Sequence, residues 1–258
     1  MGRKRRNKKI SITELAIAII LVAIFAVYEY INPEAEYLGT SNNVAVQNVV
    51  QQEKVATAVD LESVPEYSEK PYVEINNNVP YFTEEDYTVE AFEKYSEWDN
   101  LGRSGVAYAN ICMEVMPKDG EERGEIGMVK DLSGWQQKRY DDIIKDKYLY
   151  NRCHLIGWQL AGENANKQNL ITGTRYLNTE GMLPFENIVA EYIRDNPTKH
   201  VLYRVTPIYE GDNLLASGVQ MEAISVEDRG ESICFNVYCY NVQPGILIDY
   251  STGESFEG

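Results

Sequence analysis

The chain has 258 residues, of which 44% are hydrophobic, and a formal net charge of −16. This length allows one domain with additional segments, or at most two small domains, around a real hydrophobic core. Six Lys and Arg side chains precede residue 10, so residues 10–258 carry 18 basic and 40 acidic side chains, a net charge of −22. That charge argues against a nucleic-acid-binding protein, because affinity for phosphate comes largely from Lys and Arg. Residues 130–175 are the exception, with eight basic and five acidic side chains.

The N-terminus is expected to anchor the chain in a membrane. Residues 1–9 are strongly basic, and residues 10–31 form a predominantly apolar run. Such a run spans a bilayer, and basic residues before it predict a cytoplasmic N-terminus with the rest of the chain outside the cell. A cleaved signal peptide, which would give a secreted protein, is the alternative. Residues 32–70 are polar and acidic and are expected to form a flexible linker.

The remaining residues, 71–258, are predicted to form one mixed α+β domain. In chain order, the pattern predicts a strand-like stretch at 71–82, a helix at 83–99, a central strand within 99–116, a polar loop at 117–135, a helix at 136–148 and three antiparallel strands at 200–209, 214–228 and 232–250.

Four cysteines, Cys112, Cys153, Cys234 and Cys239, include no C-x-x-C pair, which disfavours a zinc knuckle or a thioredoxin-like site. We expect small buried thiols. Cys234 and Cys239 are an odd number of residues apart in a strand-like run, so they should point to opposite faces and not bond each other. If the protein is exported, a disulfide between another pair of these cysteines stays an open alternative.

The stretch from Tyr148 to Asn196 contains many side chains that can take part in catalysis or in binding. It places His154, one of two histidines in the chain, among asparagines, arginines, glycines and a carboxylate. Together these groups indicate hydrolysis of an anionic substrate. Breaking a phosphodiester requires a base for the attacking water and positive charge for the phosphorane and the departing oxygen. A histidine suits the first task near neutral pH, and a hydrated Mg²⁺ suits the second.

Three motifs in this stretch, NRCHLIGWQLAGENANKQN, TGTRYLN and GMLPFEN, resemble the DNA/RNA non-specific endonucleases of the ββα-metal superfamily, most closely the streptococcal DNA-entry and secreted nuclease branch. The resemblance covers residues 71–250. The family signature Asp-Arg-Gly-His is replaced here by Asn151-Arg152-Cys153-His154, a variant that this branch tolerates. The resemblance implies a ββα-metal fold with a central antiparallel sheet flanked by helices. It also implies cleavage of DNA without sequence specificity, and the sequence does not decide whether RNA is cut as well.

The resemblance assigns roles to four residues of the stretch. The general base falls on His154. The single protein ligand of one Mg²⁺, which Mn²⁺ can replace, falls on Asn178. Glu186 matches the carboxylate that hydrogen-bonds the waters of the metal, and Asn169 matches an asparagine that helps to fix the site. By the same resemblance, the products should carry 5′-phosphates.

Arginines are expected to bind the phosphate of the substrate. Arg152 matches a family arginine that contacts phosphate, and Arg175 is expected to bind substrate beside it. A further family arginine has two candidate positions here, Arg123 and Arg103, between which the sequence does not decide.

The connection between Asn178 and Glu186 contains Gly181 and Pro184, which disfavour one regular helix through both residues. Pro184 suits the first turn of a helix that begins close to it, leaving Asn178 in the approach to that helix. Glu191 is therefore kept as an alternative to Glu186.

Two other classes of function stay open. The acidic body is consistent with a catalytically degenerate nuclease domain that binds nucleic acid at the cell surface. Alternatively, Cys153 could act as the nucleophile of a different hydrolase, next to His154. Adjacent residues of a strand point apart, which makes that geometry poor.

Overall fold

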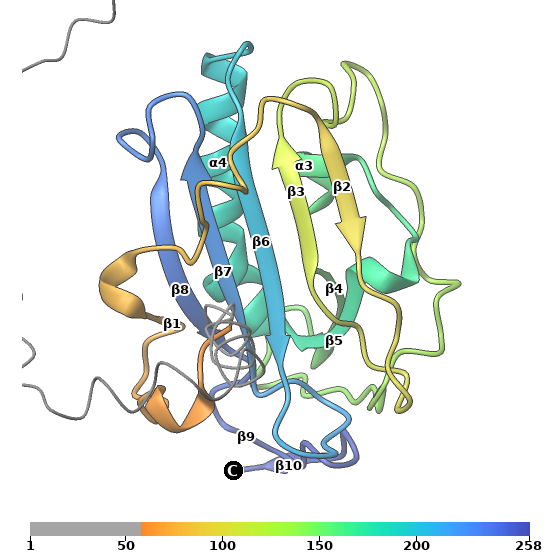
Figure 1. Cartoon of the computed structure of the whole chain (residues 1–258). Helices are drawn as coiled ribbons and strands as arrows, with labels where there is room; N and C mark the ends of the chain where they lie inside the picture. The colour runs from red at the N-terminus through yellow and green to blue at the C-terminus, as the bar shows by residue number, and fades with distance from the viewer. Residues whose placement is uncertain (1–57) are drawn as a thin grey trace, which may run out of the picture. The chain divides into compact units, whose positions relative to one another are not determined.

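The computed structural model of the chain describes residues 58–258 (Figure 1). The expected basic cap at 1–9, the expected membrane anchor at 10–31 and residues 32–57 of the expected linker lie outside this range. Within the described range, no helix combines the length and the apolar character needed to cross a bilayer.

A six-stranded antiparallel sheet forms the centre of the domain, with the strand order β1-β8-β7-β6-β3-β2. The strands are β1 Tyr72–Glu74, β2 Phe92–Tyr95, β3 Ala107–Ile111, β6 Val201–Ile208, β7 Gly218–Ser225 and β8 Cys234–Tyr240. The predicted antiparallel sheet and its three late strands are thus confirmed. The strand predicted within 99–116 is β3, which lies next to the edge strand β2 and not at the centre.

Helix α4 (Leu183–Asp195) packs on one face of the sheet, behind β6 and β7 in Figure 1. Its residues Phe185, Val189 and Ile193 recur at helical spacing and are buried, as expected for a helix with one apolar face. They join alternate strand residues such as Tyr203 in the main hydrophobic core. Burying each such aliphatic side chain stabilises the fold by about 1.5–3 kcal/mol.

The opposite face of the sheet is covered by the chain that precedes β2, which includes the short 3-10 helices η2 (Leu61–Ser63) and η3 (Asn76–Asn78). The backbone N–H of Val59 donates to Oε1 of the buried Gln220 over 2.7 Å. The packed domain therefore begins before the predicted boundary at residue 71. The expected helices that flank the sheet are thus one long α-helix, α4, on one face and short 3-10 helices on the other.

Two helix predictions are wrong. Residues 83–99 contain strand β2 and turns, and residues 136–148 form turns with one isolated bridge. In the first segment, Asn110 Nδ2 donates to the carbonyl oxygens of Thr88 (2.9 Å) and Glu90 (2.8 Å), which fixes the approach to the strand. Acidic residues and helical spacing favoured a helix locally, but pairing with β3 and these buried hydrogen bonds decide the conformation.

The stretch that carries the motifs forms two paired strands followed by the helix. β4 (Tyr150–His154) pairs antiparallel with β5 (Leu170–Thr174). Between them lie the one-turn helix α3 (Trp158–Ala161) and the 3-10 helix η4 (Lys167–Asn169). β5 leads into η5 (Leu177–Met182), a π-helical turn that continues into α4. This strand-strand-helix order is the one that the resemblance implies.

The C-terminal residues hold the start of β4 in place. They form a small antiparallel pair of β9 (Ile246–Ile248) and β10 (Ser255–Glu257). The hydroxyl of Tyr150 donates to the carbonyl of Gly253 over 2.9 Å, and the hydroxyl of Tyr140 donates to Ser255 Oγ over 2.7 Å. β4 therefore enters the site from a fixed position.

Candidate active site

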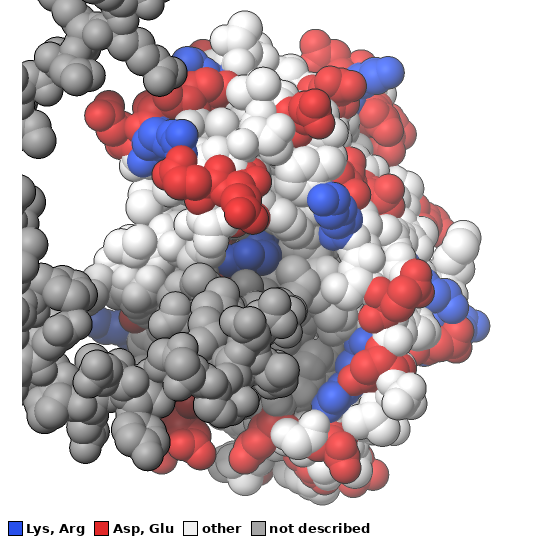
Figure 2. Space-filling view, viewed as in Figure 1, with Lys and Arg blue, Asp and Glu red and all other residues white. Residues whose placement is uncertain are grey.

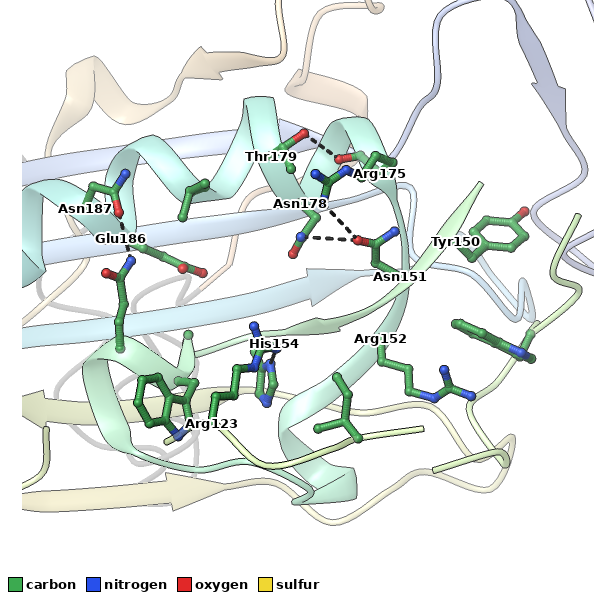
Figure 3. A pocket seen from close by; sticks show the side chains of 16 residues that line it. Arg123, Tyr150, Asn151, Arg152, His154, Arg175, Asn178, Thr179, Glu186 and Asn187 are labelled. Carbon is green, nitrogen blue, oxygen red and sulfur yellow. Dashed lines mark hydrogen bonds between the residues drawn. The ribbon is translucent and has the colours of Figure 1, made fainter. Parts of the chain in front are cut away.

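A pocket of about 510 Å³ opens beside β4, between α3, η5 and the first turn of α4 (Figure 3). It brings together five of the six predicted site residues, namely Arg152, His154, Arg175, Asn178 and Glu186. Arg123 also lines it, so its charged lining consists of three arginines and one carboxylate. Figure 2 shows many acidic side chains over the upper part of the view in Figure 1, with a few Lys and Arg among them. The pocket is thus a locally positive site on an acidic domain.

His154 is the last residue of β4, and its side chain is buried in the wall of the pocket. Its Nε2 lies 2.8 Å from the carbonyl oxygen of Asn164. Because a carbonyl only accepts hydrogen bonds, Nε2 carries the proton and Nδ1 holds the lone pair. Burial first, and then the positive charge of Arg123, lower the pKa of His154 to about 4. The imidazole is therefore neutral at physiological pH, with its basic nitrogen at Nδ1.

Arg123 is the arginine that meets this nitrogen. Its Nη2 donates to His154 Nδ1 over 3.2 Å. Arg103, the other candidate, pairs with Asp99 over 2.7 Å, and its Nη1 donates to the carbonyl of Gly211 over 2.7 Å. The structure therefore places Arg123 in the site and Arg103 outside it. Arg123 lies in a loop without regular structure, where no periodic pattern predicts the direction of a side chain.

Asn169 holds the chain that follows His154. Its Oδ1 accepts from the N–H of Ile156 and its Nδ2 donates to the carbonyl of the same residue, both over 2.9 Å. The side chain is fully buried and does not line the pocket. A buried amide with both its groups paired fixes the backbone beside the site. Asn169 thus positions the site without touching its contents.

Asn178 lies in the π-turn η5 and faces the pocket next to Asn151 (Figure 3). Its Oδ1 accepts from the thiol of Cys153 over 3.1 Å, and its Nδ2 lies 3.4 Å from Asn151 Oδ1. Arg175 Nη1 lies 3.5 Å from the same Asn151 oxygen. A thiol is a weak donor, so the Asn178 oxygen keeps acceptor capacity toward the pocket.

The π-turn resolves the expected difficulty between Asn178 and Glu186. The N–H of Leu183 donates to the carbonyl of Asn178, five residues earlier, so the wide turn runs directly into α4. Pro184 stands in the first turn of α4, where its missing N–H costs nothing. A Cβ at Gly181 would lie 3.3 Å from Cys239 Cβ, so glycine lets this turn approach β8. π-turns are frequent at functional sites.

Glu186 lies in the first turn of α4 and reaches into the pocket, whereas its alternative, Glu191, is exposed and does not line it. Burial raises the pKa of Glu186 to about 7, although a hydrogen bond from Gln159 and the charge of Arg123 oppose the rise. A Cβ on Gly157 would lie 2.7 Å from the carboxyl carbon of Glu186. Glycine at 157 therefore leaves the space that this carboxylate occupies.

The four cysteines all lie in the described range and are free. Cys112, Cys153 and Cys239 are buried as expected, whereas Cys234 is exposed, so that part of the prediction is wrong. Cys234 is the first residue of β8 and is exposed at the end of the strand, whereas Cys239 lies within the buried part of the strand. Burial raises the pKa of the Cys153 thiol far above its ordinary value. A protonated, buried thiol is a poor nucleophile, which disfavours the hydrolase alternative.

Comparison with known proteins decides the family. Residues 83–227 match the family model described as DNA/RNA non-specific endonuclease. The chain belongs to this endonuclease family. A deoxyribonuclease of Streptococcus dysgalactiae subsp. equisimilis is 33% identical over 198 residues. That match covers 62% of this chain, and the chain spans 59% of the length of the relative.

Solved structures of three similar chains share the fold of this endonuclease-family chain. NucA from Streptococcus agalactiae with no metal bound is 26% identical, with a TM-score of 0.65, and the match covers 86% of this chain and 99% of NucA. NucA with a magnesium ion bound is 25% identical, with a TM-score of 0.64, and the match covers 83% of this chain and 95% of NucA. Sda1 nuclease with a bound zinc ion is 24% identical, with a TM-score of 0.61. It shows the same fold over 78% of this chain and 100% of Sda1. The predicted streptococcal branch is confirmed.

The other two predicted arginines of this endonuclease-family chain are already engaged. Arg152 Nε donates to the carbonyl of Val129, and its guanidinium lies over the Trp135 ring, 4.3 Å from the centroid. Arg175 pairs with Asp146 over 2.5 Å. Both side chains still line the pocket. Arg123 thus lies beside His154, while Arg152 and Arg175 are held by other partners.

The oxygen atoms of the pocket fit a hard divalent cation. Among residues 58–258, no three His, Cys, Asp or Glu side chains gather in a way that could hold a metal ion. The pocket offers instead the amide oxygens of Asn178 and Asn151 and the carboxylate of Glu186. Oxygen ligands in small number suit a cation that keeps several waters, whereas Zn²⁺ cages favour nitrogen and sulfur.

Proposed function

We propose that this protein is a metal-dependent endonuclease that hydrolyses phosphodiester bonds of DNA, with RNA as a second substrate, without sequence specificity. The observation that carries the proposal is the shared pocket, which His154 lines together with Asn178 and Glu186. Membership of the DNA/RNA non-specific endonuclease family supports it. The relative named a deoxyribonuclease supports it further.

His154 is proposed as the general base. Its Nε2–H is held by the Asn164 carbonyl, which leaves Nδ1 to accept the proton of the attacking water. A pKa of about 4 makes the free imidazole neutral but weakly basic. When Arg123 turns from Nδ1 to the substrate phosphate, a positive charge leaves the imidazole and a negative charge arrives. Both changes raise the pKa of His154 and strengthen the base as the substrate binds.

Asn178 would hold one Mg²⁺, or Mn²⁺ in its place, through its amide oxygen, and Glu186 would accept hydrogen bonds from waters around the cation. When bound, the cation supplies positive charge where the phosphorane and the departing oxygen need it. Glu186 performs its role as the carboxylate, so binding of the cation should displace its proton near neutral pH. The products are expected to carry 5′-phosphates, as the family resemblance implies.

The charge distribution limits how the substrate is held. Residues 10–258 carry a net charge of −22, so we expect the arginine-lined pocket to supply the attraction for phosphate. Groups aimed at the phosphate backbone read no base edges, in agreement with cleavage without sequence specificity.

The N-terminal segment is proposed to tether the enzyme. Residues 10–31 would cross the cell membrane once and leave the nuclease domain outside, with residues 1–9 in the cytoplasm and the polar residues after 31 as the linker to the packed domain. Cleavage after the apolar run would release a secreted enzyme instead. Fractionation of cells that express the full chain tests this, since an uncleaved anchor keeps nuclease activity in the membrane fraction after an alkaline wash.

Degradation of supercoiled plasmid by the full chain tests the enzymatic proposal. We expect smears of linear fragments with Mg²⁺ or Mn²⁺ and no cleavage in EDTA. Fragments should be ligated without prior kinase treatment if their 5′ ends carry phosphate. Binding of DNA without cleavage at any divalent metal concentration would contradict the proposal and favour the degenerate, receptor-like domain.

A further inference from the structure

The pocket extends beyond the proposed catalytic residues to a stacked pair, Arg152 and Trp135. The guanidinium carbon of Arg152 lies 4.3 Å from the centroid of the Trp135 ring. Its Nε is occupied by the carbonyl of Val129, and the Trp135 ring lies 6.4 Å from that of the buried Tyr150. Arg152 is therefore held in a fixed plane by a ring and a backbone carbonyl.

The pair is offset from His154 along β4. Arg152 and His154 are two residues apart on one strand, so their side chains project from the same face about 6.6 Å apart at the backbone. Figure 3 shows Arg152 and Tyr150 toward one end of the pocket and His154 with Arg123 toward the other. A phosphate at His154 thus places a neighbouring nucleotide, and not the scissile group, beside Arg152.

We propose that the Arg152–Trp135 stack is a subsite for an unpaired nucleobase next to the cleaved phosphate. The subsite takes a flat aromatic ring of any base on the guanidinium plane, which makes the enzyme favour single-stranded or locally opened nucleic acid. This inference rests on the proposed nuclease function.

Two observations favour a base over a phosphate at this position. Arg152 already uses Nε for a backbone carbonyl, so the fork geometry that clamps a phosphate is partly taken. Both Arg152 and Trp135 are only partly buried and line the pocket, so the pair presents a rigid flat surface to a ligand. Guanidinium planes and indole rings are surfaces on which unpaired bases stack, and stacking does not depend on base identity.

An abasic substitution separates the two chemistries. A 5′-labelled single-stranded thymidine oligonucleotide is compared with the same oligonucleotide in which one internal nucleotide is an abasic tetrahydrofuran residue, so that every phosphate is kept. The full chain with Mg²⁺ should cut the unmodified strand at all internal bonds. At one bond beside the abasic residue, cleavage should fall about tenfold, the loss expected for one stacked base.

Two variants assign this loss to the stacked pair. Arg152→Lys keeps the positive charge but lacks the flat guanidinium group. Trp135→Leu removes the ring that supports the guanidinium group of Arg152. In both, the abasic strand and the unmodified strand should be cut at that bond at similar rates. Arg139→Lys is the matched control, because Arg139 lies over the ring of Tyr148 (5.4 Å to the centroid) outside the pocket, and it should keep the tenfold difference. Unchanged melting temperatures establish that the variants fold.

The outcomes are distinct. If the full chain cuts neither these strands nor plasmid DNA, the proposed nuclease function fails, and if it cuts plasmid DNA alone, only the subsite is refuted. If it cuts both strands evenly, the subsite is refuted and the nuclease function stands. A tenfold difference that persists in Arg152→Lys and Trp135→Leu also refutes the assignment. Equal loss of rate on both strands in Arg152→Lys makes Arg152 a forked phosphate contact that Lys cannot reproduce, and overturns the proposal.

Discussion

Arg123 Nη2 lies 3.2 Å from His154 Nδ1, the one ring nitrogen that can accept a proton. An arginine donates hydrogen bonds and never accepts them, so this contact requires neutral His154 and holds its pKa low. The same guanidinium can bind a phosphate when substrate arrives. Binding of substrate would thus draw Arg123 away from His154, which frees Nδ1 and makes His154 a stronger base.

Replacement of Arg123 by Ala tests this link. We expect kcat/KM for DNA to fall about 100-fold, as for loss of one preorganised donor to the reacting group. The pKa of His154, followed by NMR in the free protein, should rise because a nearby positive charge is gone. Arg229→Ala is the control, since Arg229 pairs with the exposed Glu84 and should leave both quantities unchanged. An unaltered His154 titration in Arg123→Ala would contradict the coupling.

Replacement of Glu186 by Gln should stabilise the metal-free protein while it removes activity. The folded-state pKa of Glu186 is about 7 against 4.5 for the ordinary group, so the folded state binds the proton more tightly. The ionised carboxylate therefore costs stability, with the cost appearing as pH rises from 4.5 and complete above pH 7. Gln removes a cost of about 3 kcal/mol at pH 8 and little at pH 4.5.

Denaturant unfolding in EDTA at both pH values measures this difference. Burial of His154 acts with the opposite sign between pH 4 and 6.5, but it is present in both proteins and cancels in the comparison. A Gln variant that is less stable than the parent at pH 8 would show that Glu186 is not a strained carboxylate.

Gly157→Ala should raise the Mg²⁺ concentration needed for half-maximal cleavage. The added methyl group would lie 2.7 Å from the Glu186 carboxyl carbon, so the carboxylate must move. Displacing a group that orients the waters of a metal costs about 10–100-fold in metal affinity. Gly127→Ala is the matched control, because nothing lies within 4 Å of a Cβ there. An unchanged Mg²⁺ requirement in Gly157→Ala would remove Glu186 from the metal site.

Thiol alkylation should leave the nuclease active. Cys153 is buried, and burial keeps its thiol protonated, whereas Cys234 is exposed on β8. Mass spectrometry after brief treatment with iodoacetamide should find Cys234 modified and Cys153 intact, with cleavage unchanged. Inactivation that parallels modification of Cys153 would restore the thiol-nucleophile alternative.

Much of this architecture could be predicted from local pattern. Pro184 marked the start of α4, and the late β-favouring runs marked β6, β7 and β8. The edge strand β2 was missed because its acidic, helix-spaced sequence takes its conformation from Asn110 and β3. Local propensity carries no information on such distant partners.

The site residues that belong to a sequence motif were predicted, whereas the site arginine that lies in a loop was not. His154, Asn178 and Glu186 meet in one pocket, as the motif spacing implied. Arg123 could not be chosen over Arg103, because a loop without periodicity does not reveal which side chain turns inward. The π-turn that carries Asn178 into α4 was likewise hidden, since Gly181 and Pro184 alone indicate a break.

Chemical rescue of His154→Ala tests the central claim most directly. With Mg²⁺ saturating, the variant should lose about 10²–10⁴-fold in cleavage rate, and added imidazole should restore part of it by supplying the missing base. Asn169→Ala provides a comparison, because its buried amide positions the backbone and its loss should not respond to imidazole. Cleavage by His154→Ala within a few-fold of the parent rate, with or without imidazole, would contradict the account.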